Sequence, residues 1–222
     1  MKKGVGFIFC CFIALAIYSG CKKGPEPGQV NSFKRYSFKN AHLTLKHSGD
    51  SRGTEELYIA DYGKYEARVS NIEMFRGEGL MPRQSIDLTR LAELYNVNML
   101  NHQVRHQHNP MLDSLYHLPE SDIPSPTEFY QTQMKGNYFK FEAVDTALGY
   151  KAERWYQPES KALFWIWNTL AIKQMYSTGN GFIGITMVAL DTNWVVDTNY
   201  FNVPGKGFDV HDIGPNEQLQ QM

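Results

Sequence analysis

Three histidines in the stretch HQVRHQH could bind a metal ion, and they form the densest group of candidate ligands in the sequence. His102, His106 and His108 lie at even spacings, so a β-strand would place them on one face, with Asp113 and His117 nearby. A zinc site requires three or four such ligands to converge. On an extended strand, His102 and His106 would be about 13 Å apart, too far to share one ion. We therefore expect solvated histidines near a hairpin tip and no metal site.

Two other motifs could be mistaken for ligand sites. GNGFIG, residues 179–184, fits the spacing G-x-G-x-x-G, but the dinucleotide fingerprint requires a helix after the glycines. The following ITMVAL is typical of a strand, which indicates that Gly179 and Gly181 lie in a turn. Asp209, His211 and Asp212 could bind a cation, although a solvated C-terminal tail is the better interpretation.

Other sequence features argue against several functional classes. There is no H-E-x-x-H motif, and no cysteine is placed to act as a nucleophile. The net charge of the 222 residues is −1 at pH 7, with no basic stripe or lysine-rich tail, which argues against a nucleic-acid partner. We expect neither an enzyme nor a bound cofactor.

The N-terminal segment has the layout of a secretory signal. Lys2 and Lys3 precede an apolar run over residues 5–17, which is shorter than the roughly 20 residues that a membrane-spanning helix needs. The run ends in Tyr-Ser-Gly-Cys21, which resembles a bacterial lipobox, although Tyr18 stands where leucine is usual. We predict a lipoprotein signal peptide over residues 1–20; an ordinary cleavable signal is the alternative.

Cysteine usage fits lipidation of Cys21. Cys10 and Cys11 would leave with the signal, so Cys21 would be the only cysteine of the mature chain and could form no internal disulfide. Two or more acyl chains on one residue give lasting membrane attachment. Residues 21–35 begin with a stretch rich in Pro and Gly and are expected to form a tether between the membrane anchor and the folded domain. Surface-exported Bacteroidota-type lipoproteins carry an acidic cluster after the cysteine; here two lysines follow, so we expect the outer membrane, facing the periplasm.

The rest of the chain predicts one mainly β domain over residues 36–208, followed by a tail over residues 209–222. Short alternating segments separated by Gly and Asp turns indicate an antiparallel meander before residue 109 and again after residue 136. About ten strands would form a strongly curved sheet, an incomplete barrel. Residues 109–137 are expected to form a helical insertion that covers the concave face. Within it, Ser125, Pro126 and Glu128 predict a capped helix that Gly136 can end.

The stretch LFWIWNTL, residues 163–170, is apolar on both faces of its predicted strand. Leu163, Trp165 and Trp167 would point to one side, and Phe164 and Ile166 to the other. A strand of this kind is covered on both sides by protein, by lipid or by a ligand.

Four segments carry a resemblance to a known family: GTEELYIADYGKYEARVSN, ELYNVNMLNHQVRHQHNP, LGYKAERWYQPESKALFWIWNTLAIK and DTNYFNVPGKGF. Together they resemble the periplasmic lipoprotein-carrier superfamily with the LolA/LolB-like fold, and most closely its Bacteroidota outer-membrane lipoproteins. The resemblance covers most of residues 41–208 and is a pattern of strands and turns. It implies an incomplete barrel that encloses an apolar cavity, with helices as a lid.

This resemblance leads to a functional hypothesis. A protein attached to the membrane through Cys21 would bind an apolar ligand, an acyl chain or a lipid, between sheet and helices, and would act in lipoprotein or lipid handling at the cell envelope. The residues expected to line that space are Trp165, Trp167, Phe129, Tyr130 and Met134. In the alternative, helices fill the concave side and the protein is a structural or adaptor lipoprotein without a ligand.

Overall fold

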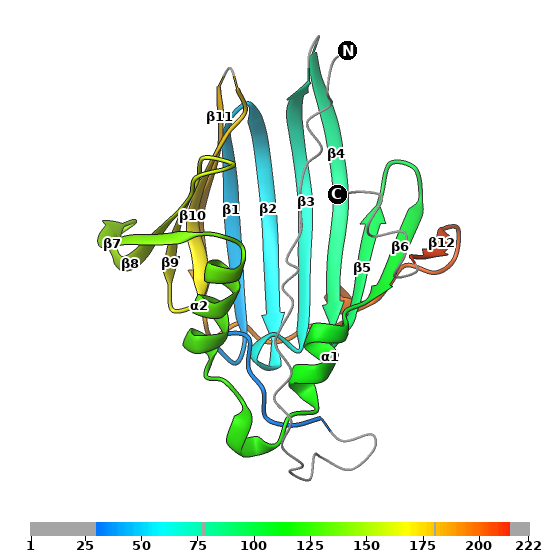
Figure 1. The fold of residues 1–222 in the computed structure, drawn as a ribbon. Helices are drawn as coiled ribbons and strands as arrows, with labels where there is room; N and C mark the ends of the chain where they lie inside the picture. The colour runs from blue at the N-terminus through cyan, green and yellow to red at the C-terminus, as the bar shows by residue number, and fades with distance from the viewer. Residues whose placement is uncertain (1–29, 77–78, 180, 214–222) are drawn as a thin grey trace.

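The computed structural model describes residues 30–76, 79–179 and 181–213, which form a mainly β architecture, as the sequence predicts (Figure 1). The strands of this part of the chain are β1 (Ala41–Gly49), β2 (Ser51–Ala60), β3 (Tyr65–Arg76), β4 (Gly79–Arg90), β5 (Glu93–Asn98), β6 (Gln103–His108), β7 (Lys140–Ala147), β8 (Tyr150–Gln157), β9 (Ala162–Trp167), β10 (Leu170–Ser177), β11 (Phe182–Asp191) and β12 (Asp209–Asp212). The helices are α1 (Pro110–Tyr116), α2 (Pro126–Gly136) and the 3-10 helices η1 (Asp61–Gly63), η2 (Glu120–Asp122) and η3 (Thr198–Phe201). Cys21 and the predicted signal and most of the tether lie outside the described residues.

All twelve strands belong to one sheet, in the order β12-β6-β5-β4-β3-β2-β1-β11-β10-β9-β8-β7. The first six strands form one meander and β7 to β11 form a second, and the two join where β11 pairs with β1. Neighbouring strands are antiparallel except for β12, which runs parallel to β6. The sheet is strongly curved and does not close, so that β12 and β7 are its edges (Figure 1). Register irregularities in β1/β11, β10/β9 and β7/β8 are of the kind that bends strands.

The structure has twelve strands where the sequence predicts about ten. One of the additional strands is β12, formed by four residues that were expected to begin a solvated tail. All four side chains are exposed, so backbone pairing rather than side-chain burial holds them. The amide of Asp209 donates to the carbonyl of His102 over 2.9 Å, and that of Ile213 donates to His106 over 2.8 Å. A strand without buried residues leaves no alternation for sequence analysis to detect.

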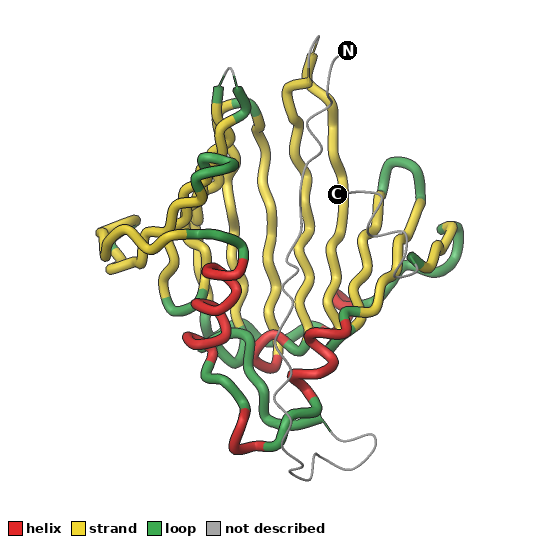
Figure 2. The backbone as a smooth tube through the Cα atoms, in the orientation of Figure 1, coloured by secondary structure: helices red, strands yellow, loops and turns green. Residues whose placement is uncertain are grey.

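Both α-helices lie on the concave side, near one end of the long strands (Figure 2). The predicted capping box of α2 is present: the Ser125 hydroxyl accepts from the Glu128 amide, and the Glu128 carboxylate accepts from the Ser125 amide. The helix ends with Gly136, and Asn137 is its C-cap. Asn109 caps α1 by accepting from the amides of Met111 and Leu112. Within the described residues, no helix combines the length and the apolar character needed to cross a membrane.

Strand β9 contains most of the doubly apolar stretch, and protein covers it on both faces. Phe164 and Ile166 pack in a cluster with Trp155 and with Met134 of α2. Trp165 is buried and belongs to the large core cluster around β1, β2, β10 and β11, and Trp167 packs against the same cluster. The stretch is therefore explained by core packing on each side.

Candidate functional site

The concave face of the sheet is divided into an apolar half and a polar half. Strand pairing identifies this face, because directly paired residues point to the same side of a sheet. Trp155, which α2 covers, pairs with Phe164. The row continues across the sheet through Gln174 and Ile185 to His47. Around β1 and β11 the face carries buried apolar residues. From β2 to β5 it becomes polar along a cross-strand row of four directly paired residues: Glu55, Ser70, Ser85 and Asn98.

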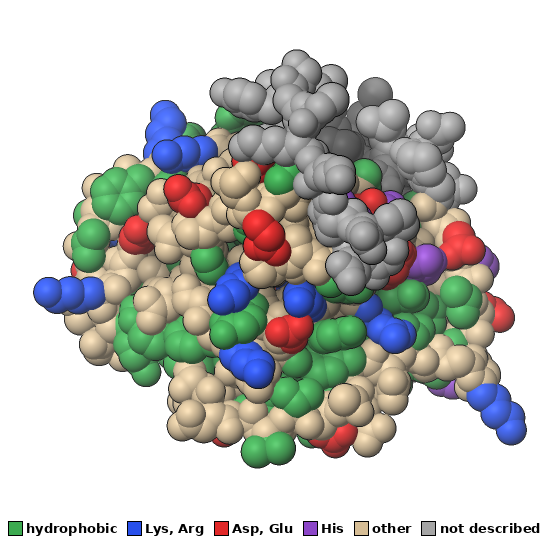
Figure 3. All heavy atoms as spheres, turned by 90° about the horizontal axis from the view of Figure 1, so that it is seen from below, with side chains coloured by type: hydrophobic (Ala, Val, Ile, Leu, Met, Phe, Trp, Pro, Cys, Tyr) green, Lys and Arg blue, Asp and Glu red, His purple; other side chains and the backbone are tan. Residues whose placement is uncertain are grey.

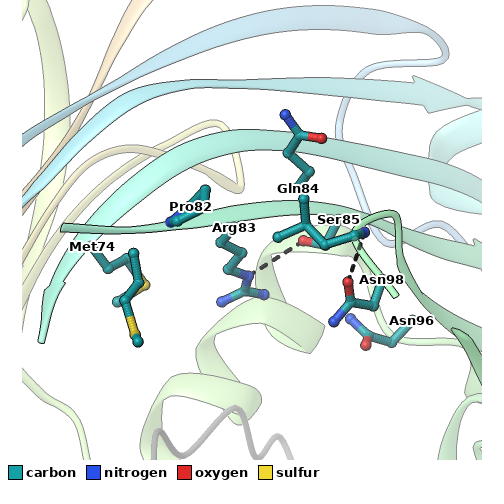
Figure 4. A pocket seen from close by; sticks show the side chains of 9 residues that line it. Met74, Pro82, Arg83, Gln84, Ser85, Asn96 and Asn98 are labelled. Carbon is teal, nitrogen blue, oxygen red and sulfur yellow. Dashed lines mark hydrogen bonds between the residues drawn. The ribbon is translucent and has the colours of Figure 1, made fainter. Parts of the chain in front are cut away.

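A pocket of about 310 Å³ lies in the polar half, where β3 ends, β4 begins and β5 ends (Figure 4). The helices lie toward the opposite end of these strands (Figure 1). The lining residues are Met74, Met81, Pro82, Arg83, Gln84, Ser85, Asn96, Asn98 and Leu100. Two of the apolar ones, Met81 and Leu100, are 56% and 52% exposed. The pocket therefore combines apolar and polar groups at the surface.

Arg83 lies at the centre of the labelled side chains of this pocket. Figure 4 shows Arg83, Ser85, Asn96 and Asn98 extending to one side of the sheet, with Gln84 on the other, as strand alternation requires. Nε of Arg83 donates to Oγ of Ser85 over 3.3 Å. The side-chain oxygen Oδ1 of Asn98 accepts from the backbone amides of Leu100 and Asn101, at 3.0 and 3.3 Å. With that oxygen occupied, the Asn98 side chain is left with its amide hydrogens as donors.

A second pocket, of about 350 Å³, lies beside the N-terminus of α2. Four of its polar residues are paired with one another: Ser32 donates its amide and hydroxyl to Glu120, and Ser125 and Glu128 form the capping box. The underside of the molecule, where the helices lie, carries hydrophobic, basic and acidic side chains mixed together rather than a patch of one kind (Figure 3). Lys34 also lines this pocket, and its Nζ lies over the ring of Tyr62, 4.2 Å from the ring centroid.

A serine, a histidine and a carboxylate meet in the concave face beside the first pocket. Oγ of Ser51 lies 2.9 Å from Nδ1 of His47, and Nε2 of His47 lies 3.4 Å from Oε1 of Glu55. Ser51 is in the sequence GDSRG, which fits the serine-hydrolase motif G-x-S-x-G, a match that sequence reasoning missed. In that motif a helix follows the serine, whereas here Ser51 begins strand β2. Ser51 is 0% exposed, so no substrate reaches it in this conformation.

Charge compensation explains the burial of this cluster. Glu55 accepts from Ser70 over 3.0 Å and pairs with Arg68 over 3.3 Å. Burial opposes ionisation of Glu55, but the hydrogen bonding and charge of His47 and the charge of Arg68 outweigh it and lower its pKa to about 2. The carboxylate therefore stays ionised inside the sheet at neutral pH.

Two of the three histidines of HQVRHQH, His106 and His108, contact carboxylates. His102 lies in the turn before β6, whereas His106 and His108 lie on β6 and bind the two oxygens of Glu93, at 2.7 and 2.8 Å. His106 also lies 2.7 Å from Asp212 of β12. His108 and His117 lie 3.8 and 3.5 Å from Asp113. In the described residues, no group of three or more His, Cys, Asp or Glu is arranged to hold a metal ion.

The structure distributes the five predicted ligand-lining residues over three clusters. Tyr130 and Met134 of α2 pack against Trp155 and Ile166. Phe129 packs against Phe33, with ring centroids 5.1 Å apart. Trp165 lies under Lys173 and Trp167 against Tyr150. None of the five lines either pocket described above.

The pocket residues that sequence reasoning missed do leave a signal. In RQSID and YNVN, polar residues recur at every second position: Arg83, Ser85 and Asp87, then Asn96 and Asn98. This alternation predicts one polar face on each strand. It does not predict that the two polar faces are adjacent on the concave side, because that depends on the pairing of β4 with β5.

Comparison with known proteins adds no functional assignment. No family model matches the sequence, and none of the curated proteins matches it. Among solved structures, an uncharacterized conserved protein from Thermus thermophilus aligns with a TM-score of 0.47 and 10% identity, over 82% of this chain and 95% of that one. LprF from Mycobacterium bovis aligns with a TM-score of 0.31 and 9% identity, over 73% of this chain and 89% of that one. At these scores the alignments carry no argument about function.

Proposed function

We propose that this protein is a lipid-anchored envelope protein that binds an apolar ligand, such as an acyl chain or a lipid, on the concave face of its sheet. The binding position proposed from the structure is the pocket at the far end from the helices, not the contact between sheet and helices. The sequence resemblance to the LolA/LolB-like lipoproteins of Bacteroidota supports the same class of function. The lipobox-like segment before Cys21 supports anchoring in the outer membrane, facing the periplasm.

The proposal rests on one observation: exposed apolar side chains line the pocket. Met81 and Leu100 are more than half exposed, and Met74 lies beside them in the lining. An exposed apolar surface rimmed by polar residues is typical of a binding site. Each methylene that the ligand buries there would contribute about 0.8 kcal/mol before ordering costs.

Extraction of the purified protein with organic solvent, followed by mass spectrometry, tests the proposal. The full chain carries Cys21→Ala, so that its own anchor cannot be mistaken for ligand. We expect co-purified lipid at a defined stoichiometry, lost when Met81 and Leu100 are both replaced by Asp. Val188→Asp is the matched control, because Val188 is 58% exposed and lies outside the pocket. An extract that stays clean after incubation with membrane lipids would reject the proposal.

A second candidate function is that of an adaptor that binds another protein without a small ligand. Specific support comes from the apolar residues exposed along the same end of the sheet, which include Phe75 and Leu80 of the β3–β4 hairpin and Met99 after β5. Such surfaces also occur at protein interfaces. Clean extracts combined with specific capture of an envelope protein, lost in Phe75→Asp, would favour this function.

A further inference from the structure

The pocket contains a cation with no ionic partner among the described residues. Four other arginines are ion-paired: Arg35 with Glu66, Arg52 with Glu73, Arg68 with Glu55, and Arg154 with Glu142 and Asp145. Arg83 has no such pair with any residue that the structure describes, and its hydrogen bond there is to the neutral Ser85. Its guanidinium is therefore available for an external anion.

Two carboxylates of the polar half of the concave face have other partners than Arg83. Asp87, two residues beyond Ser85 on β4, accepts from Nδ2 of Asn96. Glu55, in the next part of the concave face, pairs with Arg68. Neither of them forms an ion pair with Arg83 in this part of the chain. The charge of Arg83 acts on Asp87 only at longer range, where it opposes the rise in the pKa of that carboxyl that burial causes.

The groups beside Arg83 are suited to an acceptor ligand. A guanidinium presents its N–H groups in a planar fork that matches a carboxylate or a phosphate. The amide of Asn98, whose oxygen is occupied by backbone N–H groups, offers donors only. The hydroxyl of Ser85 can donate as well. Donors therefore predominate at the base of the pocket, and Met74, Met81 and Leu100 form its apolar part.

We propose that Arg83, with Asn98 and Ser85, binds an anionic group, a carboxylate or a phosphate, of an amphipathic ligand whose apolar part lies against Met81 and Leu100. This inference rests on the proposed function and specifies the chemical class of the ligand. The polar end of the ligand would contact Arg83, and its apolar chain would contact the exposed side chains of Met81 and Leu100.

Calorimetric titration of the full chain carrying Cys21→Ala tests the assignment with three probes: decyl phosphate, decanol and inorganic phosphate. We expect decyl phosphate to bind the unsubstituted site most tightly. Arg83→Gln should weaken that binding by about tenfold to a hundredfold, the usual value of a charged hydrogen bond, and leave decanol binding unchanged. Arg90→Gln is the matched control, because Arg90 lies at the opposite end of the same strand.

The other outcomes separate this inference from the function on which it rests. If decyl phosphate and decanol bind equally well and Arg83→Gln changes neither affinity, the claim that the ligand carries an anionic group is wrong, and the proposal of an apolar ligand is retained. If inorganic phosphate binds as tightly as decyl phosphate and Arg83→Gln abolishes this binding, the site is an anion site and the proposal that its ligand is a lipid is wrong. Absence of binding by all three probes would overturn both. Circular dichroism of Arg83→Gln checks that the fold is retained.

Discussion

Oγ of Ser51 lies 2.9 Å from Nδ1 of His47, and both side chains are buried in the concave face of the sheet. With Glu55 on the other side of the imidazole, these residue types match those of a nucleophilic triad. Their burial distinguishes them from one, because a nucleophile must meet its substrate. We interpret the three residues as a structural polar cluster.

This interpretation predicts that a fluorophosphonate probe does not label Ser51. Under conditions that fully label a known serine hydrolase, the intact protein should keep its unmodified mass. Ser51→Ala should instead lower the free energy of unfolding by about 1 kcal/mol, the typical value of a lost hydrogen bond. Labelling that disappears in both Ser51→Ala and His47→Gln would show that the serine is activated and that the protein is a hydrolase.

Glu55→Gln should destabilise the protein more than loss of an exposed ion pair does. Removing one partner of a buried pair costs about 3 to 5 kcal/mol, and we expect about 2 to 3 here because Arg68 remains partly exposed. Denaturant unfolding at pH 7 measures the difference. Glu73→Gln is the control: its pair with Arg52 is exposed, so the cost should stay below about 1 kcal/mol.

The pH dependence of this difference has a defined sign. Glu55 has a pKa of about 2 in the folded protein, below its ordinary value of 4.5, so its contribution is present above pH 4.5 and is lost as the pH falls towards 2. The gap between the wild-type protein and Glu55→Gln should therefore shrink on acidification over this range. A gap that stays constant between pH 5 and 2 would contradict the role assigned to the carboxylate.

Strand β12 should be held more firmly in mildly acidic solution than in alkaline solution. Burial opposes protonation of His106, but its hydrogen bonds to Asp212 and Glu93 outweigh this and raise its pKa above 6.5. Hydrogen bonds from His108 and His106 to Glu93 overcome the burial of Glu93 and lower its pKa below 4.5. The contribution of His106 is lost as the pH rises through its raised pKa, and that of Glu93 is lost as the pH falls through its lowered pKa. The attachment should be strongest between about pH 4.5 and 6.5.

Amide hydrogen exchange can follow this attachment at single residues. The amides of Asp209 and Ile213, which donate to carbonyls at β6 and the turn before it, should exchange faster at about pH 8 than at about pH 6 after correction for intrinsic rates. His106→Gln should remove the difference, whereas His211→Gln, an exposed position on β12, should preserve it. The same dependence in both variants would exclude His106 as its cause.

The two faces of β9 should differ in their effect on α2. Ile166→Ala removes a buried contact of the cluster that contains Met134, so it should cost about 2 to 4 kcal/mol and reduce hydrogen-exchange protection of α2 more than that of β2. Trp167→Ala acts on the other face, where the ring packs against Tyr150 and Phe38. It should leave the protection of α2 relative to β2 unchanged. Equal loss from both variants would mean that α2 contacts both faces.

Much of the fold could be predicted from local sequence signals. Ser125 and Glu128 predict the start of α2 because a capping box depends only on residues three positions apart. The strands follow from alternation and from Gly turns such as the one before Phe182, where Gly179 has a φ of 90°. The strongly apolar β9 correctly indicated that both of its faces are covered.

What covers each face could not be predicted in this way. Trp165 and Trp167 are conspicuous in sequence and are predicted to line a ligand site; in the structure Trp165 belongs to the large core cluster and Trp167 packs against it. Arg83 and Asn98 are inconspicuous, and they meet only because β4 and β5 pair in one register. Sites assembled from cross-strand neighbours depend on contacts that the order of residues does not contain.

The convex face carries a segment whose attachment can be tested directly. After β11, residues 194–203 cross β2 to β4 on this side, with Phe201 buried among Tyr58, Ala67 and Leu88. Tyr200 stacks on Tyr58 with ring centroids 3.9 Å apart.

Phe201→Ala should therefore cost about 3 to 4 kcal/mol and make this segment sensitive to limited proteolysis. Tyr200→Ala should cost about 1 kcal/mol, because that ring is already partly exposed and loses mainly one aromatic contact. Val195→Ala, at a side chain that is 85% exposed, is the control and should change neither stability nor cleavage. Phe201→Ala could instead unfold as cooperatively as this control and resist cleavage equally well. The sheet would then be stable without the segment, and the packing of Phe201 against Tyr58, Ala67 and Leu88 would contribute little to holding β2 to β4 together.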